Sequence, residues 1–235
     1  MQSNKKITDK RRFSVVMKIT AIVIVMAILI GSTAIYAGYY LHSTTMNQYY
    51  KNQVVNISKT LSKYIPADYI EQLKEAASDP ELETVREEAI ASDNPDLVKD
   101  WMIQKGVYDD YEKVLSILED FRNNMGMTYV YVLNNQANYS TYLADPDEDM
   151  TIFGKREDNT AGFEQYTSNE EIPPTVSEGE YGWLCSGYEP IYSEDGKAIA
   201  LIGVDISMNE VVGQQMDFLK QMLTWLTILT LIIVI

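Results

Sequence analysis

Two long apolar segments constrain this chain more than any other feature of its sequence. Residues 19–36 contain no charged side chain and consist mainly of Ile, Val, Ala and Met. A helix needs about 20 apolar residues to cross a bilayer, and this segment reaches that length once its apolar neighbours are included. A second apolar segment covers residues 222–235. We therefore expect one transmembrane helix over 19–41 and the start of a second, cut off mid-span, over 218–235.

The charges on either side of the first apolar segment predict how the chain is oriented. Residues 1–18 carry six Lys and Arg against a single Asp. Because positively charged flanks stay in the cytoplasm, this N-terminus is expected to be cytoplasmic and the region after the span extracytoplasmic. Residues 37–220 hold 33 acidic and 13 basic side chains, a net charge of −20. Such a surface argues against nucleic acid as a partner and against docking on anionic lipid.

A cleavable secretory signal is the alternative for the N-terminal segment, since a basic start and an apolar core describe that as well. The core is longer here than the usual roughly 7–15 residues, and the best cleavage-like triplet, Ser32-Thr33-Ala34, is weak. We therefore favour an uncleaved anchor. Cys185 is the only cysteine, so no internal disulfide can form. An extracytoplasmic region without disulfides is typical of a bacterial protein and indicates the bacterial cell membrane.

The clearest local signals lie in residues 181–210. Asp195-Gly196 is typical of a two-residue β-hairpin turn, because both residues tolerate the positive φ angles of a type I′ turn. The apolar run 198–204 predicts a buried strand. Ser207 and Glu210 fit the S-x-x-E pattern of a capping box, which begins a helix. The last strand is thus expected to lead directly into the final helix.

The hairpin register predicts which side chains share a face of the sheet. Counting back from the turn places Ser186 opposite Asp205. Tyr188 follows Ser186 by two residues on the same strand. Side chains alternate between faces along a strand, so these three residues are expected on one face. Trp183 and Cys185 would then point to the other face, unless a bulge shifts the register.

Periodicity predicts the remaining elements. Apolar residues at spacings of four and three over 50–64 mark one helical face, which would pack on the domain's own sheet or on the same helix of a second copy. A similar stripe in the final helix favours a homodimer through the membrane-proximal helices. Further helices are predicted over 68–77, 81–91, 96–105 and 110–125, strands over 127–133 and 139–144, and a polar irregular segment over 145–174.

The order of these segments, with the strand MTYVYVL and the sequence YGWLCSGYEPIYSEDGKAIALIGVDIS, resembles the extracytoplasmic Cache domains of bacterial receptors. The resemblance implies an α+β fold, in which a PAS-like antiparallel sheet with a core over 110–207 joins a long N-terminal helix and extra helices. A single sensor domain over 42–217 would be flanked by two transmembrane helices. Its implied function is small-molecule sensing and signalling to a cytoplasmic output module beyond this chain, of the chemoreceptor, histidine-kinase or diguanylate-cyclase type.

Asp205 is the first candidate for ligand contact. A carboxylate at the end of an apolar strand costs free energy unless it is paired or hydrogen-bonded. In amine-recognising Cache domains an aspartate in a similar Val-Asp-Ile context helps to hold the ligand's amino group, so the resemblance implies an amino acid or an amine as ligand. The alternative is that Asp205 hydrogen-bonds the backbone where the strand meets the helix.

Aromatic and basic residues supply the other candidates. Aromatic side chains give a pocket apolar walls with polar tips, although they also serve as ordinary sheet core. Lys155 and Arg156 are candidate partners for a ligand carboxylate, or solvated loop charges. The aromatic candidates are Tyr129, Tyr131, Tyr142, Trp183 and Tyr188.

Other site classes receive no support from the sequence. The acidic cluster at 145–149 lacks EF-hand spacing, and the single histidine, His42, has no partner for zinc, so neither a metal nor a cofactor is expected. No hydrolase, nucleotide-binding or metalloprotease motif occurs, so this stretch is not expected to be an enzyme. The alternative function is a membrane-anchored module that binds another protein through the acidic helical region 67–106.

Overall fold

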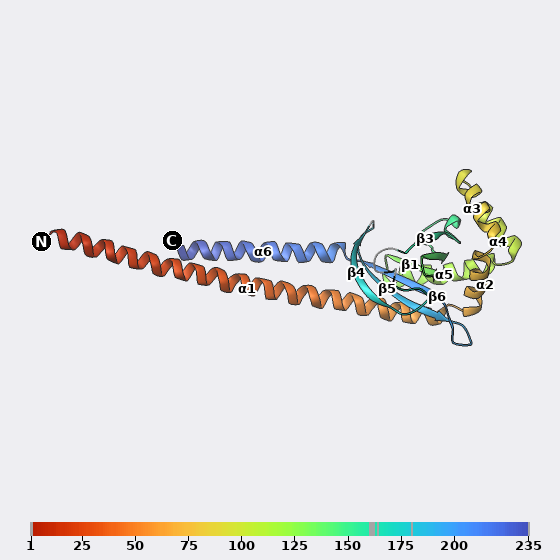
Figure 1. Cartoon of the computed structure of the whole chain (residues 1–235), viewed down its shortest axis with the longest axis horizontal. Coiled ribbons are helices and arrows are strands. Elements are labelled where there is room, and N and C mark those ends of the chain that lie inside the picture. The colour runs from red at the N-terminus through yellow and green to blue at the C-terminus, as the bar shows by residue number, and fades with distance from the viewer. Residues whose placement is uncertain (1, 160–162, 164, 180, 235) are drawn as a thin grey trace. The chain divides into compact units, whose positions relative to one another are not determined.

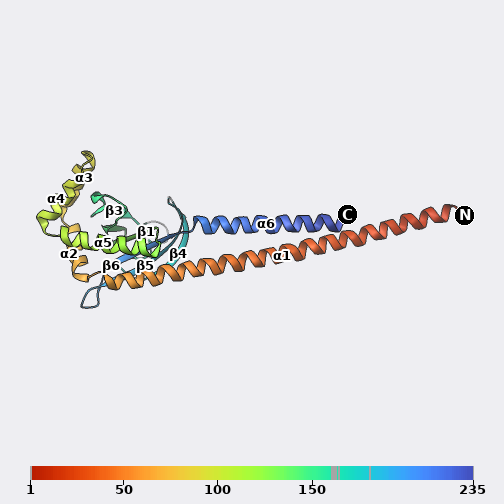
Figure 2. The same cartoon turned by 180° about the vertical axis from the view of Figure 1, so that it is seen from behind.

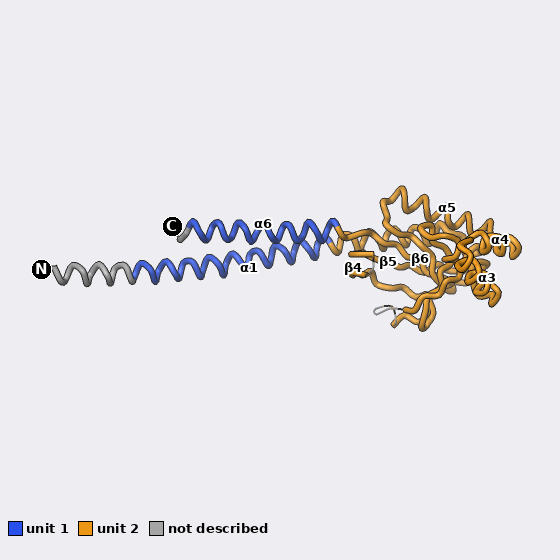
Figure 3. Tube along the Cα trace, turned by 90° about the horizontal axis from the view of Figure 1, so that it is seen from above, with its two compact units in different colours: residues 1–46, 210–235 blue, residues 47–209 orange. Residues whose placement is uncertain are grey.

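The computed structural model describes every residue except 1, 160–162, 164, 180 and 235. The chain divides into two units, one made of residues 1–46 and 210–235 and the other of residues 47–209 (Figure 3).

The first unit consists of helical segments from α1 (Gln2–Tyr64) and α6 (Asn209–Val234). Within this unit the Ser43 hydroxyl donates a hydrogen bond of 3.2 Å to Gln215 Oε1. One helix among the described residues, within Val15–Tyr64, contains a segment long and apolar enough to cross a membrane. The second span over 218–235 stays a prediction.

The second unit begins with the end of α1 and four short helices, whose starts and ends follow local sequence signals. Asp79 caps one helix by accepting a hydrogen bond of 2.9 Å from the Glu81 amide, and Pro80 occupies the first helical position, where a missing N–H costs nothing. Gly106 and Gly126 end two others with φ angles of 77° and 66°, a conformation that glycine adopts without strain. The predicted helices are confirmed as α2 (Ala67–Ala77), α3 (Pro80–Ala91), α4 (Asp96–Lys105) and α5 (Tyr108–Met125).

The rest of the second unit is a six-stranded antiparallel sheet in the order β3-β2-β1-β6-β5-β4. Figures 1 and 2 show this curved sheet, with α2, α3 and α4 gathered at one end of the unit. The α+β fold with a PAS-like antiparallel sheet is therefore confirmed. The strands are β1 (Tyr129–Asn135), β2 (Tyr139–Ala144), β3 (Arg156–Asp158), β4 (Ile172–Gly179), β5 (Gly182–Tyr192) and β6 (Ala198–Ser207).

The segment predicted as irregular, 145–174, contains more structure than expected. It includes a 3-10 turn at Met150–Ile152, the strand β3 and the first residues of β4. Strand β3 is three residues long and pairs only with β2 among the described strands. It is held by backbone bonds to that neighbour, and such bonds leave no trace in the sequence pattern.

The β5–β6 hairpin keeps the predicted register but not the predicted turn. Ser186 pairs with Asp205 and Tyr188 with Gly203, as expected. The chain reverses through a four-residue turn closed by a 2.9 Å hydrogen bond from the Gly196 amide to the Ser193 carbonyl, and only Gly196, at 80°, has a positive φ angle in it. A shift in pairing between Ile191 and Tyr192 compensates for the longer turn.

The start of α6 also differs from the predicted capping box. The helix begins at Asn209, whose amide lies 3.5 Å from the Ser207 hydroxyl. Glu210 instead accepts a hydrogen bond of 3.0 Å from Gln214. Strand β5 contributes to this helix start, because the Trp183 amide donates to Asn209 Oδ1 at 2.9 Å.

The end of α1 packs on one face of the sheet, which is one of the two surfaces predicted for its apolar stripe. Val54 and Leu61 are fully buried, and Ser58 is 1% exposed. Gly187 on β5 permits this approach, since a Cβ there would lie 2.8 Å from Val54 Cγ2 and 3.1 Å from its carbonyl carbon. Tyr64, predicted on the same stripe, is 65% exposed because the buried face is rotated toward Ser58.

Candidate ligand-binding site

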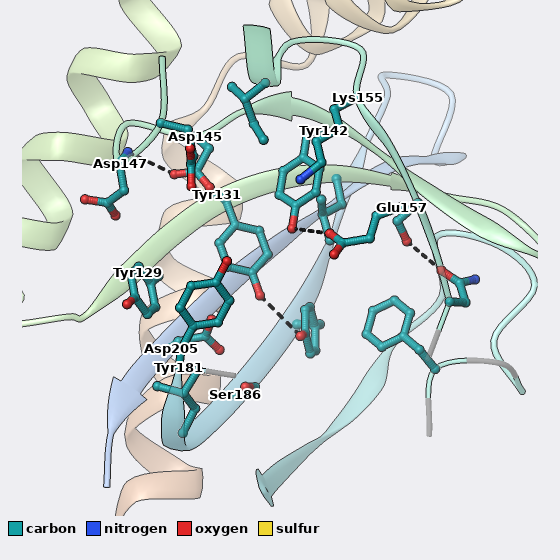
Figure 4. Close-up of a pocket in the computed structure, with 18 of the residues that line it drawn as sticks. Tyr129, Tyr131, Tyr142, Asp145, Asp147, Lys155, Glu157, Tyr181, Ser186 and Asp205 are labelled. Atoms are coloured by element: carbon teal, nitrogen blue, oxygen red, sulfur yellow. Dashed lines mark hydrogen bonds between the residues drawn. The ribbon is translucent and has the colours of Figure 1, made fainter. Parts of the chain in front are cut away.

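The other face of the sheet holds a cavity of about 320 Å³. Its walls come from β1, β2, β5 and β6 and from the segment between β2 and β4 (Figure 4). Aromatic side chains make up much of the lining. They are Tyr129, Tyr131, Tyr142, Phe163, Tyr181 and Tyr188.

Strand pairing brings these aromatic residues together. Tyr131 on β1 and Tyr188 on β5 both lie opposite Gly203 of the central strand β6. Because Gly203 has no side chain, the ring of Tyr131 lies over its α-carbon, where a Cβ would overlap with it. The two tyrosine hydroxyls are 3.2 Å apart. Phe163 continues the wall, with its ring centroid 4.9 Å from that of Tyr188.

Asp205 lies in the next row of the sheet, between Tyr129 on β1 and Ser186 on β5. It is 4% exposed, and its Oδ1 has no hydrogen-bond partner among the residues that the structure describes. Burial raises the pKa of this carboxyl to about 6, although the hydroxyls of Ser186 and Tyr131 favour the charged form. Asp205 is therefore a buried acid that lines the cavity, and its Oδ1 lacks a partner among the described residues.

Asp145 is the second buried acid in the lining. It follows β2 directly and is 8% exposed. Burial is the main cause that raises its pKa to about 6, and the carboxylates of Asp147 and Glu148 act in the same direction. Its Oδ1 accepts a hydrogen bond of 2.9 Å from the Asp147 amide. Arg122 forms its ion pair with Asp147 rather than with Asp145.

The lining is strongly acidic overall. Tyr142 donates a hydrogen bond of 2.9 Å to Glu157 at the rim. Lys155, whose Nζ lies 5.7 Å from the centroid of the Tyr142 ring, is the one basic residue among the described residues that line the cavity. Such a lining favours a positively charged ligand over an anion. The acidic residues are Asp145, Asp147, Glu148, Glu157, Asp158 and Asp205.

A network of asparagines holds the segment beside the cavity. Asn135 donates from Nδ2 to the carbonyls of Tyr166 and Ser168 at 3.0 and 2.9 Å. Its backbone amide donates to Asn169 Oδ1 at 2.7 Å. Asn159 donates from Nδ2 to Asn135 Oδ1 at 3.1 Å. These bonds attach residue 159 and residues 166–169, on either side of Phe163, to the end of β1.

The structure brings most of the predicted site residues together. Asp205, Tyr129, Tyr131, Tyr142 and Tyr188 all line the cavity. Two other predicted residues do not belong to this lining. Trp183 is out of phase with Ser186 and Tyr188 along β5, and the Arg156 guanidinium lies 5.1 Å from the centroid of the Tyr139 ring.

Several lining residues were not predicted. Asp145 was considered only as part of an acidic loop, and Tyr181, Ser186 and Phe163 were not named as ligand contacts. The register did place Ser186 beside Asp205, and that signal was sufficient to identify it. No group of three or more His, Cys, Asp or Glu side chains in the described part of the chain is arranged to hold a metal ion.

Comparison with known proteins returns structures rather than sequences, since no family model and no curated protein matches the chain. The ligand-binding domain of the Campylobacter jejuni chemoreceptor Tlp3 in complex with L-valine is 16% identical, covers 80% of this chain and has a TM-score of 0.35. This chain spans 65% of the length of that solved chain. The sensory domain of Tlp3 with isoleucine bound gives 14% identity, the same two coverages and a TM-score of 0.34.

The Escherichia coli DcuS sensor domain is also similar, at 15% identity over 67% of this chain and 98% of that one, with a TM-score of 0.34. All three are sensor or ligand-binding domains, the class that the sequence resemblance named.

Proposed function

We propose that residues 47–209 form an extracytoplasmic sensor domain that binds a small organic cation, with Asp205 as the partner of the ligand's ammonium group. The observation that supports this most directly is the Asp205 carboxylate, which is 4% exposed and has an oxygen without a partner among the described residues. The same oxygen belongs to a side chain that lines a cavity of about 320 Å³.

The physical argument starts from the cost of a buried charge. A carboxylate that is buried without a cation loses its hydration and gains little in return. An ammonium group would supply charge-assisted hydrogen bonds, which are about twice as strong as neutral ones. The faces of the surrounding tyrosine rings attract cations as well. A ligand amine therefore fits both the carboxylate and the walls.

Charge also separates the ligand classes. A dicarboxylate would bring two negative charges into a lining with six acidic residues and one lysine. An α-amino acid would place its own carboxylate near those acids, with Lys155 as its one basic partner in the described lining. Simple amines meet no such repulsion, so we place them first and amino acids second.

Signal transmission is proposed through the strand that carries Asp205. Strand β6 ends at Ser207, and α6 begins two residues later at Asn209. The Trp183 carbonyl accepts a 2.7 Å hydrogen bond from the Met208 amide, which ties β5 to the same junction. Suppose that the domain has two conformations that differ in the position of β6. A ligand that binds these conformations with different affinity would shift the equilibrium between them. The proposed output is a cytoplasmic module, reached through membrane spans and, in a homodimer, through paired helices.

A thermal-shift screen of the full chain in detergent tests the proposal. Pentylamine, valine, succinate and glucose represent the amine, amino acid, dicarboxylate and sugar classes. A ligand that binds only the folded state stabilises it by about 2.7 kcal/mol at a hundredfold excess over Kd. We expect saturable stabilisation by pentylamine and none by succinate. Stabilisation by succinate alone would contradict the proposal. No shift with any class would also contradict it and would favour a protein partner on α2–α4.

A further inference from the structure

Two carboxylates in the cavity are buried, and each lacks an ion pair. Asp205 is 4% exposed and Asp145 is 8% exposed. Neither forms a salt bridge with any Lys or Arg in the described part of the chain. A ligand with one positive charge at Asp205 would leave Asp145 buried in the same cavity without a cation from the ligand. The two buried carboxylates therefore favour a ligand that carries more than one positive charge.

Two other acids near Asp145 have partners, and a third, Glu148, is exposed to solvent. Asp147 is engaged by Arg122, and Glu157 accepts the hydrogen bond of Tyr142. Asp145 accepts only the backbone amide of Asp147 among the described hydrogen bonds. A backbone amide is a neutral donor, and Arg122, whose positive charge acts to lower the pKa of Asp145, forms its ion pair with Asp147 instead. Asp145 is thus the lining acid, besides Asp205, that most needs a cation from the ligand.

The sheet fixes the separation of the two carboxylates. Asp145 directly follows β2, Asp205 lies on β6, and β1 runs between these strands. Adjacent strands are about 4.8 Å apart, so two spacings separate the backbones by roughly 10 Å. The pairing of Ala144 with Val132 places Asp145 near the row of Tyr131, while Asp205 lies in the row of Tyr129. A short alkyl chain with a nitrogen at each end has the length to span such a gap.

The wall between the two acids suits a chain of methylene groups. Tyr131 projects from β1, the strand between them, and its ring centroid lies 6.1 Å from that of Tyr142 and 6.5 Å from that of Tyr188. Figure 4 shows Tyr131 between Asp145 and Asp205. Aromatic faces bury apolar surface, whereas the acids at the two ends require charge. The lining therefore alternates from charged to apolar to charged.

We infer that the ligand is a short aliphatic diamine, with one ammonium on Asp205 and the other on Asp145. This inference rests on the proposed function, because it assigns a second contact in the same site. It narrows the ligand class from cations in general to molecules with two cationic nitrogens and an apolar chain between them. An amine with a carboxylate at its far end is excluded by the same geometry.

Calorimetric titration of the full chain in detergent compares the affinities of a diamine and a monoamine. Cadaverine and pentylamine have the same carbon chain and differ in one terminal amine. A charge-assisted hydrogen bond in a buried site changes affinity by roughly tenfold or more. We expect cadaverine to bind at least about tenfold more tightly than pentylamine.

Two variants identify the second contact. Asp145→Asn keeps an acceptor for the Asp147 amide, and it should lower cadaverine affinity by about tenfold while weakening pentylamine much less. Asp149→Asn removes the same charge from a neighbouring residue outside the lining, where Asp149 caps the turn at Met150–Ile152. This control should bind cadaverine like the wild type. Melting temperatures of the ligand-free variants check that each is folded.

The possible results test the diamine assignment separately from the proposed function, which is the binding of a cation at Asp205. Equal binding of the two amines, or equal weakening of both by Asp145→Asn, would overturn the diamine assignment and leave the cation site at Asp205 standing. Absence of binding by both amines to the wild type would overturn both.

Discussion

The ring of Tyr131 lies over the α-carbon of Gly203 on the neighbouring strand, so a side chain at position 203 and the ring cannot occupy the same space. Tyr188 flanks the same glycine from the other side and places its hydroxyl 3.2 Å from that of Tyr131. The central wall of the cavity therefore depends on the one glycine of β6.

Gly203→Ala is expected to displace Tyr131 and to abolish amine binding. Inserting a methyl group into a packed site typically costs about 1–3 kcal/mol, so the melting temperature should fall as well. Gly179→Ala is the matched control, because a Cβ at that strand position meets no atom within 4 Å. Thermal denaturation and calorimetric titration of both variants measure the two effects. Wild-type affinity in Gly203→Ala would contradict the role given to the Tyr131 ring.

Asp205→Asn is expected to stabilise the ligand-free protein at neutral pH while weakening ligand binding. Burial raises the pKa of Asp205 from its ordinary value to about 6. A rise of roughly two pKa units means that the charged form costs about 3 kcal/mol at neutral pH. An asparagine removes that cost, so unfolding in urea at about pH 7 should require more denaturant.

The pH dependence of that difference has a defined sign. Because the folded pKa of Asp205 lies above its unfolded value, the folded state binds the extra proton as pH falls. The stability of the wild type should therefore rise relative to Asp205→Asn as pH drops through about 6 toward about 4. Denaturant unfolding at several pH values measures this difference. A gap between the two proteins that stays constant over this range would contradict the account of Asp205 as a buried, uncompensated carboxylate.

Gly187→Ala is expected to loosen the contact between α1 and the sheet. A Cβ at position 187 would lie 2.8 Å from Val54 Cγ2 and 3.1 Å from its backbone carbonyl carbon. The loss of stability should be about 1–3 kcal/mol. Adding Val54→Ala removes Cγ2 but keeps the Val54 Cβ, 2.9 Å from the added Cβ, and the carbonyl carbon, so the double variant should recover only part of what the two single changes lose. Full additivity in a double-mutant cycle would show that residues 54 and 187 do not interact.

Asn135→Ala is expected to release the segment that carries Phe163. Asn135 holds the carbonyls of Tyr166 and Ser168 and accepts from Ser140 and Asn159. Loss of buried hydrogen bonds of this kind costs about 1–3 kcal/mol. Faster hydrogen exchange over 165–171, with protection retained in α5, would support this role. Unchanged exchange in that segment would contradict it.

The sequence predicted the regular elements and the register around Asp205 because both depend on local signals. The apolar spacing in 110–125, the alternation of Tyr129 and Tyr131, and the count from Asp195-Gly196 to Ser186 each involve residues close together in the chain. The turn itself was mispredicted, since Asp195 has no positive φ angle and Ser193 joins the turn. A bulge at Ile191 and Tyr192 restored the register, and such shifts leave no mark in the sequence.

The remaining parts of the site depend on contacts between distant segments. Asp145 lies in an acidic loop by sequence, and only the pairing of β1, β2 and β6 brings it into the same cavity as Asp205. The Asn135 network joins the end of β1 to two segments of the polar region, at Asn159 and at 166–169, and that region has no periodicity to indicate it. One signal was available: asparagine is uncommon in strands, so a pair of asparagines at 134 and 135 indicates a role for their side chains.

The most direct test of the central claim is a calorimetric titration of pentylamine into the full chain and into Asp205→Asn, at about pH 8, above the pKa of about 6 for Asp205. We predict saturable one-to-one binding to the wild type and affinity at least about tenfold lower in the variant, because the charged hydrogen bond to the ammonium is lost. Equal affinity for the two proteins would show that the amine does not bind at Asp205.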